Sequence, residues 1–109
     1  MKTQHFMASL CWYGAQGGAL KADDRGVIFA AQKLTLPDKL KKIKMPYNSI
    51  KLAVCRCALG FPAVEITLDS GAEYKFIVFG RERLLRILEC HRVMVVRSAN
   101  IIGKFKING

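Results

Sequence analysis

The sequence predicts a mainly β domain that ends in a single α-helix. Apolar and polar residues alternate in short segments over most of the chain, as in strands with one buried face. Glycine, aspartate and proline separate these segments at intervals that suit turns. From Arg81 the apolar period changes to three or four residues, which is typical of an amphipathic helix. With 109 residues, the chain has the size of one domain, and we expect a single core.

The first strands are expected around two turns. Segments 9–13 and 18–22 flank the glycine-rich residues 14–18, whose glycines permit the positive φ angles of a reversal. Residues 23–26 form a second turn sequence, because aspartate side chains accept hydrogen bonds from the backbone that follows them. This turn leads into the apolar segment 27–30, which we predict to be the third strand.

Four further strands follow, and residues 64–78 form the clearest hairpin, with its turn at 69–71. Residues 34–44 begin as a loop before the chain alternates into a fourth strand. A fifth strand starts at Ile50 and ends before a turn at 59–62. The side chains expected to point inward from these strands are Ile43, Met45, Ile50, Leu52, Val54, Val64, Ile66, Leu68, Tyr74, Phe76 and Val78.

The helix is predicted over residues 81–94 and closes the core. Its apolar face would carry Leu84, Ile87, Leu88, His91 and Met94. Glu82 and Arg86 are spaced as an i, i+4 ion pair on the opposite face. Beyond the helix, residues 104–107 alternate again and could form one more strand, a docked tail, a strand that pairs across a dimer, or a disordered end.

Charge is the most informative polar feature. The chain has 18 Lys and Arg residues against 8 Asp and Glu, a net charge of +10 that draws in anions. Between residues 33 and 56 only Asp38 opposes the excess, which comprises Lys33, Lys39, Lys41, Lys42, Lys44, Lys51 and Arg56. Such a run is either a solvated face or a ligand site, and composition alone leaves both open.

No catalytic, metal or cofactor site is expected. Cys11, Cys55, Cys57 and Cys90 lack the CxxC pairs of a zinc site and the density of a disulfide scaffold, so we expect four reduced, mostly buried thiols. His5 is expected in a loose terminus, and His91 as a core or rim side chain. Neither has the neighbouring acid or nucleophile that catalysis requires, and glycines 14, 17 and 18 lack the strand–helix context of a phosphate loop.

The expected location is cytoplasmic, at most peripheral to a membrane. Charged or polar residues interrupt every apolar run before it reaches the ~18–20 residues that a membrane-spanning helix needs. The first 14 residues contain Gln4, His5 and Ser9 and lack the continuous apolar block of a secretory signal.

Three segments carry a family pattern: residues 17–29 (GGALKADDRGVIF), 46–50 (PYNSI) and 65–76 (EITLDSGAEYKF), followed by the helix. In this order they resemble the GRAM family of pleckstrin-homology-like domains. Ala22 stands where that family usually has threonine, Met45 precedes the proline, and the family does not cover the tail beyond Val93. The resemblance implies an N-terminal extension at 1–7, a domain at 8–94, and a C-terminal tail or extra strand at 95–109.

The resemblance further implies a barrel or sandwich of two antiparallel sheets packed nearly at right angles, with the helix capping one open end. Domains of this family are thought to bind membranes, phosphoinositides or protein segments, and they are not enzymes. Against specific inositol-phosphate recognition, the first hairpin carries Gln16 and glycines in place of basic residues, with only Lys21 on the strand that follows.

We therefore hypothesise a non-catalytic module in which Lys33, Lys39, Lys41, Lys42 and Lys44 contact an anionic membrane or lipid headgroup while Leu40 inserts. Each basic residue near such a surface contributes about 1 kcal/mol. A protein segment bound at a sheet edge or beside the helix is the alternative. Nucleic acid ranks below both, because the lysine segment lacks the interleaved aromatics that stack on bases.

Overall fold

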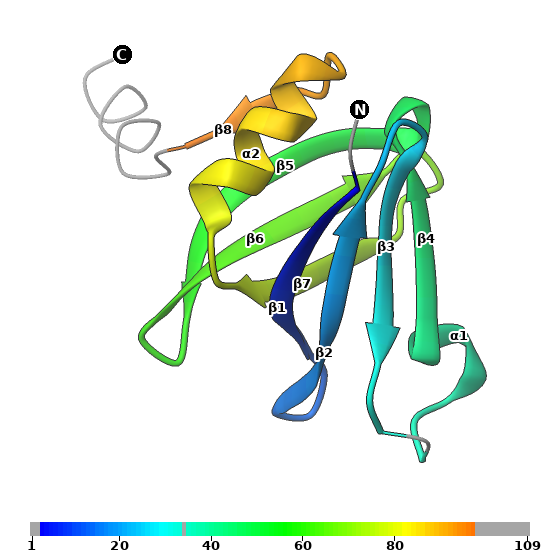
Figure 1. Ribbon diagram of the computed structural model, residues 1–109. Coiled ribbons are helices and arrows are strands. Elements are labelled where there is room, and N and C mark those ends of the chain that lie inside the picture. Colours follow the sequence, from blue (N-terminus) through cyan, green and yellow to red (C-terminus); the bar gives the residue numbers. More distant parts are fainter. Residues whose placement is uncertain (1–2, 34, 98–109) are drawn as a thin grey trace.

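Strands dominate the structure, a computed structural model that describes residues 3–33 and 35–97 (Figure 1). In chain order the elements are β1 (Gln4–Cys11), β2 (Ala15–Ala22), β3 (Gly26–Ala31), α1 (Asp38–Lys41), β4 (Lys42–Pro46), the 3-10 turn η1 (Tyr47–Ser49), β5 (Ile50–Ala58), β6 (Phe61–Leu68), β7 (Glu73–Val78), α2 (Arg81–Cys90) and β8 (Val95–Val96). The mainly β prediction is confirmed, and the short helix α1 is an addition to it. Within the described residues, no helix is long and apolar enough to cross a bilayer.

The described strands form one continuous sheet in the order β4-β3-β2-β1-β7-β6-β5-β8, rather than the two separate sheets expected. Strand β1 joins the two halves, because it pairs with β2 along its length and with β7 at residues 8–10. All pairings are antiparallel except that of β8, which runs parallel to β5. Figure 1 shows β5, β6 and β7 running across the direction of β1–β4, so the sheet folds over on itself and encloses a core.

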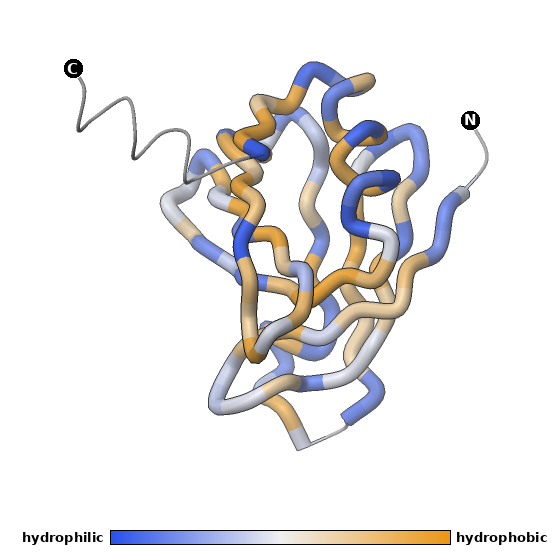
Figure 2. Tube along the Cα trace, turned by 90° about the vertical axis from the view of Figure 1, so that its left-hand side faces the viewer, coloured by the Kyte–Doolittle hydropathy of each residue, from blue (hydrophilic) through white to orange (hydrophobic). Residues whose placement is uncertain are grey.

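The core lies between the two halves of this folded sheet. Phe29 of β3 and Phe76 of β7 meet there, with ring centroids 5.2 Å apart. Ile43 and Met45 point inward from β4, and the predicted hairpin of β6 and β7 buries Val64, Ile66, Phe76 and Val78. Figure 2 shows hydrophobic residues along the strands and hydrophilic residues gathered at the loops and turns.

The predicted inward face of β5 is wrong beyond Ile50. The pairing register between β5 and β6 shifts between Ile50 and Leu52, and an extra residue in a strand reverses which side chains face the core. As a result Ala53 and Cys55 belong to the core cluster. Val54 is buried as predicted but lies outside that cluster, paired with Val96 of β8, and Leu52 is only half-buried. A simple alternation reading of this strand could not detect the bulge.

The helix α2 begins where predicted and ends four residues earlier. Its buried side chains are Leu84, Leu85 and Leu88, so the core-facing stripe is rotated relative to the predicted face. His91 follows the helix as its C-terminal flanking residue. Arg92 then adopts a left-handed conformation with φ 65°, which stops the helix and leaves Met94 67% exposed. The predicted Glu82–Arg86 ion pair is present at 3.7 Å.

The first hairpin turns earlier than predicted. Strand β1 starts at Gln4 rather than residue 9, so residues 4–7 of the expected N-terminal extension are paired, and His5 lies opposite Lys21 instead of in a loose terminus. The chain reverses at residues 12–14, and Gly17 and Gly18 lie within β2. Gly18 serves close packing, since a Cβ there would lie 2.3 Å from the carbonyl oxygen of Ala30.

After α2, the chain returns to the sheet edge. Val95 and Val96 pair with residues 53 and 54 of β5. Arg97 then holds the outside of the helix, with its Nη2 2.6 Å from Oε1 of Glu89 and its Nε 2.9 Å from Oε1 of Glu82. The predicted strand at 104–107, and its pairing across a dimer, lie outside the described residues.

Candidate functional site

The lysine-rich segment forms the connection between β3 and β4 and the edge strand itself. Lys33 is exposed just after β3, Lys39 and Lys41 lie on α1, and Lys42 and Lys44 lie on β4. The structure therefore brings all five predicted residues to one side of the sheet, next to its β4 end. Figure 1 shows α1 at the lower end of β4, at the same end of the molecule as the loop between β1 and β2.

Leu40 does not insert into anything outside the protein. The helix α1 starts after Pro37, whose carbonyl oxygen accepts hydrogen bonds from the backbone N–H groups of Leu40 at 2.8 Å and Lys41 at 3.2 Å. This turn directs Leu40 into the core, where it is only 7% exposed. The insertion role predicted for Leu40 is wrong, because the short helix uses that side chain as its anchor.

Strand β4 displays its lysines by simple alternation. Ile43 and Met45 point into the core, so Lys42 and Lys44 on the same strand point outward. The pairing register aligns Lys44 with Ile28 of β3, Ile28 with Lys21 of β2, and Lys21 with His5 of β1. Lys21 therefore belongs to the same outer face. The sequence signal was present, because Lys21 lies between two apolar residues of a predicted strand, but its alignment with Lys44 needs the register.

This positive charge is nearly uncompensated. Lys41 is paired with Asp38, with 3.1 Å between Nζ and Oδ1, and the Asp38 side chain is 98% exposed. Within residues 3–33 and 35–97, no ion pair is recorded for Lys33, Lys39, Lys42 or Lys44. The arrangement can attract an extended anionic surface, and Lys44 also lines a hollow formed by residues of β3 and β4.

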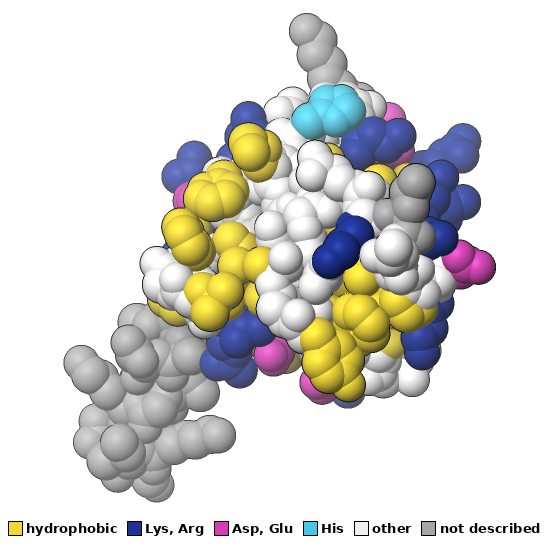
Figure 3. Space-filling model, turned by 90° about the horizontal axis from the view of Figure 1, so that it is seen from below, with side chains coloured by type: hydrophobic (Ala, Val, Ile, Leu, Met, Phe, Trp, Pro, Cys, Tyr) yellow, Lys and Arg dark blue, Asp and Glu magenta, His cyan; other side chains and the backbone are white. Residues whose placement is uncertain are grey.

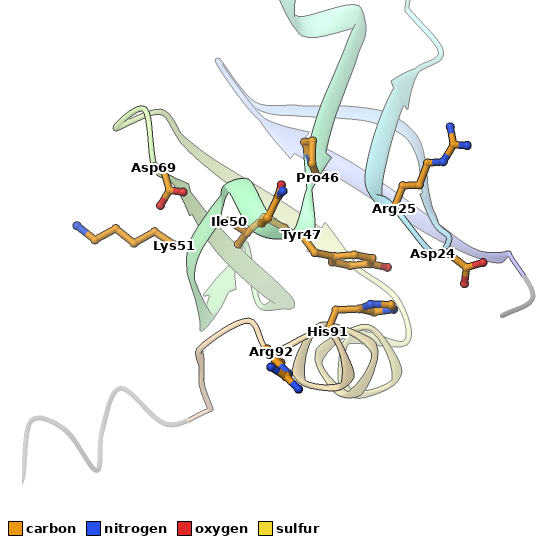
Figure 4. Close-up of a pocket in the computed structure, with 10 residues that line it drawn as sticks. Asp24, Arg25, Pro46, Tyr47, Ile50, Lys51, Asp69, His91 and Arg92 are labelled. Carbon is orange, nitrogen blue, oxygen red and sulfur yellow. The ribbon is translucent and has the colours of Figure 1, made fainter.

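The opposite end of the molecule carries a broad groove of about 830 Å³ between the turn before β5 and the end of α2 (Figure 4). Tyr47 stacks on His91 there, with ring centroids 3.9 Å apart and planes 3° from parallel. The Tyr47 hydroxyl donates a 2.6 Å hydrogen bond to the carbonyl oxygen of Asp23. Burial, and then the negative charges of Asp23 and Asp24, raise the pKa of Tyr47 to about 12.

In this groove the Tyr47–His91 stack joins the turn before β5 to the end of α2. Its charged lining mixes acids and bases: Asp24, Asp69, Arg25, Lys51 and Arg92. Figure 4 shows the Lys51 and Arg25 side chains pointing away from the stacked rings in different directions. Asp23 is fixed in its turn, because hydrogen bonds from the backbone N–H groups of Arg25 and Gly26 lower the pKa of its carboxyl. The lining therefore has no single sign of charge with which to draw in a ligand.

A second group of exposed residues escaped the sequence interpretation. Trp12 and Tyr13 lie in the β1–β2 loop and Leu59 lies in the β5–β6 loop, and Tyr13 and Leu59 are 90% and 75% exposed. The sequence predicted Trp12 and Tyr13 at the end of the first strand and Leu59 in a turn, and their side chains were not considered as a surface. The available signal was a bulky apolar residue directly before glycine at a hairpin tip, where asparagine or aspartate is usual.

The four cysteines are free, but they are not mostly buried. Only Cys55 is buried, Cys11 is half-buried, and Cys57 and Cys90 are exposed. Burial raises the pKa of the Cys55 thiol, so this cysteine acts as a small apolar core residue. Among the described residues, no group of three or more His, Cys, Asp or Glu side chains is placed to hold a metal ion.

Comparisons with known proteins show the fold. No family model and no curated protein matches the chain. A solved structure described as the C-terminal domain of an unknown protein from Leishmania infantum superimposes with a TM-score of 0.65 at 12% identity, covering 81% of this chain and 80% of that one. A structure of the Spt16D Pob3N heterodimer gives a TM-score of 0.70 at 14% identity, covering 90% of this chain but 55% of the other.

Proposed function

We propose that this protein is a non-catalytic binding module with a pleckstrin-homology-like fold of the GRAM type, which docks to an anionic membrane surface. The observation that carries the proposal is the outward, largely unpaired lysine set on α1, β4 and the loop before them. A flat array of cations beside a sheet edge suits a planar surface of many negative headgroups better than one small ligand.

The expected strength is modest. Each lysine near an anionic surface contributes about 1 kcal/mol, and the attraction falls off within a Debye length of roughly 8–10 Å at physiological salt. Lysines that reach the surface together therefore give weak, salt-sensitive binding. Lys41 contributes less than the others as long as Asp38 stays within 3.1 Å of it.

Vesicle co-sedimentation tests the proposal. The protein should pellet with vesicles of equal parts phosphatidylcholine and phosphatidylserine, and remain in solution with phosphatidylcholine alone. Changing Lys39, Lys41, Lys42 and Lys44 to alanine should abolish pelleting at physiological salt. Lys51→Ala with Arg86→Ala is the control, because it also removes surface charge but leaves the lysine segment intact. Equal pelleting of the wild type and the four-lysine variant would disprove the proposal.

A protein segment is the second candidate, and the β4 edge favours it. Strand β4 ends the described sheet and pairs only with β3 there, so its other backbone edge can accept an added strand. The similar structure named as a heterodimer also contains this fold in an assembly of two chains. This candidate predicts capture of a partner that survives moderate salt, because buried apolar contacts are not screened as exposed charges are.

A further inference from the structure

The β1–β2 and β5–β6 loops share an unusual backbone feature. Tyr13 has φ 49° and precedes Gly14, and Leu59 has φ 53° and precedes Gly60. Left-handed positions of this kind favour glycine, asparagine or aspartate, because a bulky side chain crowds its own backbone there. Both hairpins nevertheless place a large apolar side chain at this position and expose it to solvent.

The β1–β2 loop is braced in its shape. The buried side chain of Gln16 donates from Nε2 to the carbonyl oxygens of Trp12 at 2.9 Å and Tyr13 at 3.4 Å. The backbone N–H of Trp12 donates to the carbonyl oxygen of Gly14 at 2.8 Å. The rings of Trp12 and Tyr13 meet edge to face, with centroids 4.8 Å apart. Tyr13 is therefore held outward by the loop's own hydrogen bonds before any ligand arrives.

The two loops line one hollow. Trp12, Tyr13 and Leu59 contribute to a depression of about 480 Å³, with Lys75 of β7 also in its wall. Figure 3 views the molecule from this end and shows hydrophobic side chains in two groups, with most Lys and Arg side chains around the margin. In Figure 3 white atoms and a basic side chain lie between the two apolar groups. Apolar groups with basic side chains around them match a bilayer whose headgroups are anionic and whose interior is hydrocarbon.

We propose that the Trp12-Tyr13 and Leu59 tips penetrate the boundary between headgroups and acyl chains of an anionic bilayer while the neighbouring lysines bind its headgroups. This inference rests on the proposed membrane docking and specifies which side chains enter the bilayer. Tryptophan and tyrosine suit this boundary because each has an apolar body and a polar handle. The net charge of +10 and the lysine segment at the same end favour this occupant over a second copy of an equally basic chain.

Trp12 supplies a direct test, because it is the chain's one tryptophan. Mixing the wild type with vesicles of equal parts phosphatidylcholine and phosphatidylserine should shift Trp12 emission to shorter wavelength. Brominated phosphatidylcholine chains should then quench it, and aqueous acrylamide should quench it less than in the free protein. Tyr13→Ser with Leu59→Ser should weaken vesicle affinity by about tenfold or more, since the membrane gains less apolar area.

Met94→Ser is the matched control, because Met94 is 67% exposed but follows α2, at the other end from the hairpin tips. It should keep wild-type affinity. Binding to anionic vesicles with no emission shift and no loss in the double variant would overturn the insertion and leave charge-driven docking intact. Absence of vesicle binding by the wild type would overturn both proposals. A dimer in sedimentation velocity that the double variant abolishes, without any emission shift, would assign the tips to a second copy.

Discussion

Tyrosine and leucine side chains are buried at the α2 end of the molecule and exposed at the loop end, where the β1–β2 and β5–β6 loops lie. At the α2 end, Tyr47 stacks on His91 and donates a hydrogen bond to Asp23, and the helix leucines are fully buried. At the loop end, Tyr13 is 90% exposed and Leu59 is 75% exposed, both with left-handed backbones. The α2 end buries its leucines and Tyr47, although Met94 is exposed there, whereas the loop end leaves Tyr13 and Leu59 outside. This difference predicts that truncations at the α2 end lower stability, whereas truncations at the loop end lower the proposed vesicle binding.

Truncating one leucine at each end should give the largest difference in stability. Leu88→Ala removes a fully buried side chain between α2 and the sheet, so the free energy of unfolding should fall by about 2–5 kcal/mol. Leu59→Ala, the matched change at the loop end, should leave it within about 0.5 kcal/mol of the wild type. Urea unfolding followed by circular dichroism measures both. A similar loss in the two variants would mean that the loop end is part of the core.

A second test concerns where on the surface the charge matters. Lys39 and Lys42 lie at the loop end, whereas Lys21 lies on β2, further along the outer face of the sheet, and Lys51 lies in the groove at the α2 end. Alanine at Lys39 and Lys42 should weaken binding to anionic vesicles by about 2 kcal/mol, or roughly thirtyfold. Alanine at Lys21 and Lys51 removes the same charge outside the proposed contact and should cost clearly less. Equal losses would show that net charge alone drives binding, without a preferred orientation.

The α2 end makes a smaller, pH-dependent prediction. Tyr47→Phe keeps the ring on His91 but removes the hydroxyl that bonds to Asp23, so the free energy of unfolding should fall by about 1 kcal/mol at pH 7. The folded protein holds the Tyr47 proton to a pKa of about 12, above the unfolded value of about 10. The stabilisation is therefore complete below pH 10 and is lost as pH rises toward 12.

Denaturant unfolding at pH 7 and between pH 10 and 12 measures both effects. The variant should lack the part of the alkaline decrease that Tyr47 causes. Tyr13→Phe is the control, because it removes a hydroxyl from an exposed ring at the loop end and should retain wild-type stability at pH 7. An unchanged alkaline decrease in Tyr47→Phe would contradict the raised pKa of Tyr47, which burial and the charges of Asp23 and Asp24 cause.

Alternation and turn chemistry were enough to predict most strands of this fold, because a half-buried strand must alternate. Hydrophobic periodicity predicted the wrong inward face for β5, where one extra residue shifts the register. It also predicted too long a helix, because Arg92 ends α2 before the periodic pattern ends. Neither a bulge nor a left-handed stop follows from hydrophobicity. The lysine segment was visible from composition, but Leu40 became an anchor only through the short helix α1.

A last, small change in stability is expected when the backbone strain at Leu59 is relieved. Leu59→Gly relieves a left-handed conformation that costs leucine roughly 1–2 kcal/mol, and this gain is partly offset by about 0.5–1 kcal/mol of added chain entropy in the unfolded state. The free energy of unfolding should therefore rise by about 0.5–1 kcal/mol while vesicle affinity falls. Gly60 directly follows and already has φ 80°, so the turn itself can persist. Thermal unfolding and vesicle titration of the same sample give both quantities. A variant that is less stable than the wild type would show that Leu59 packs against the protein, and the strain would then need no functional explanation.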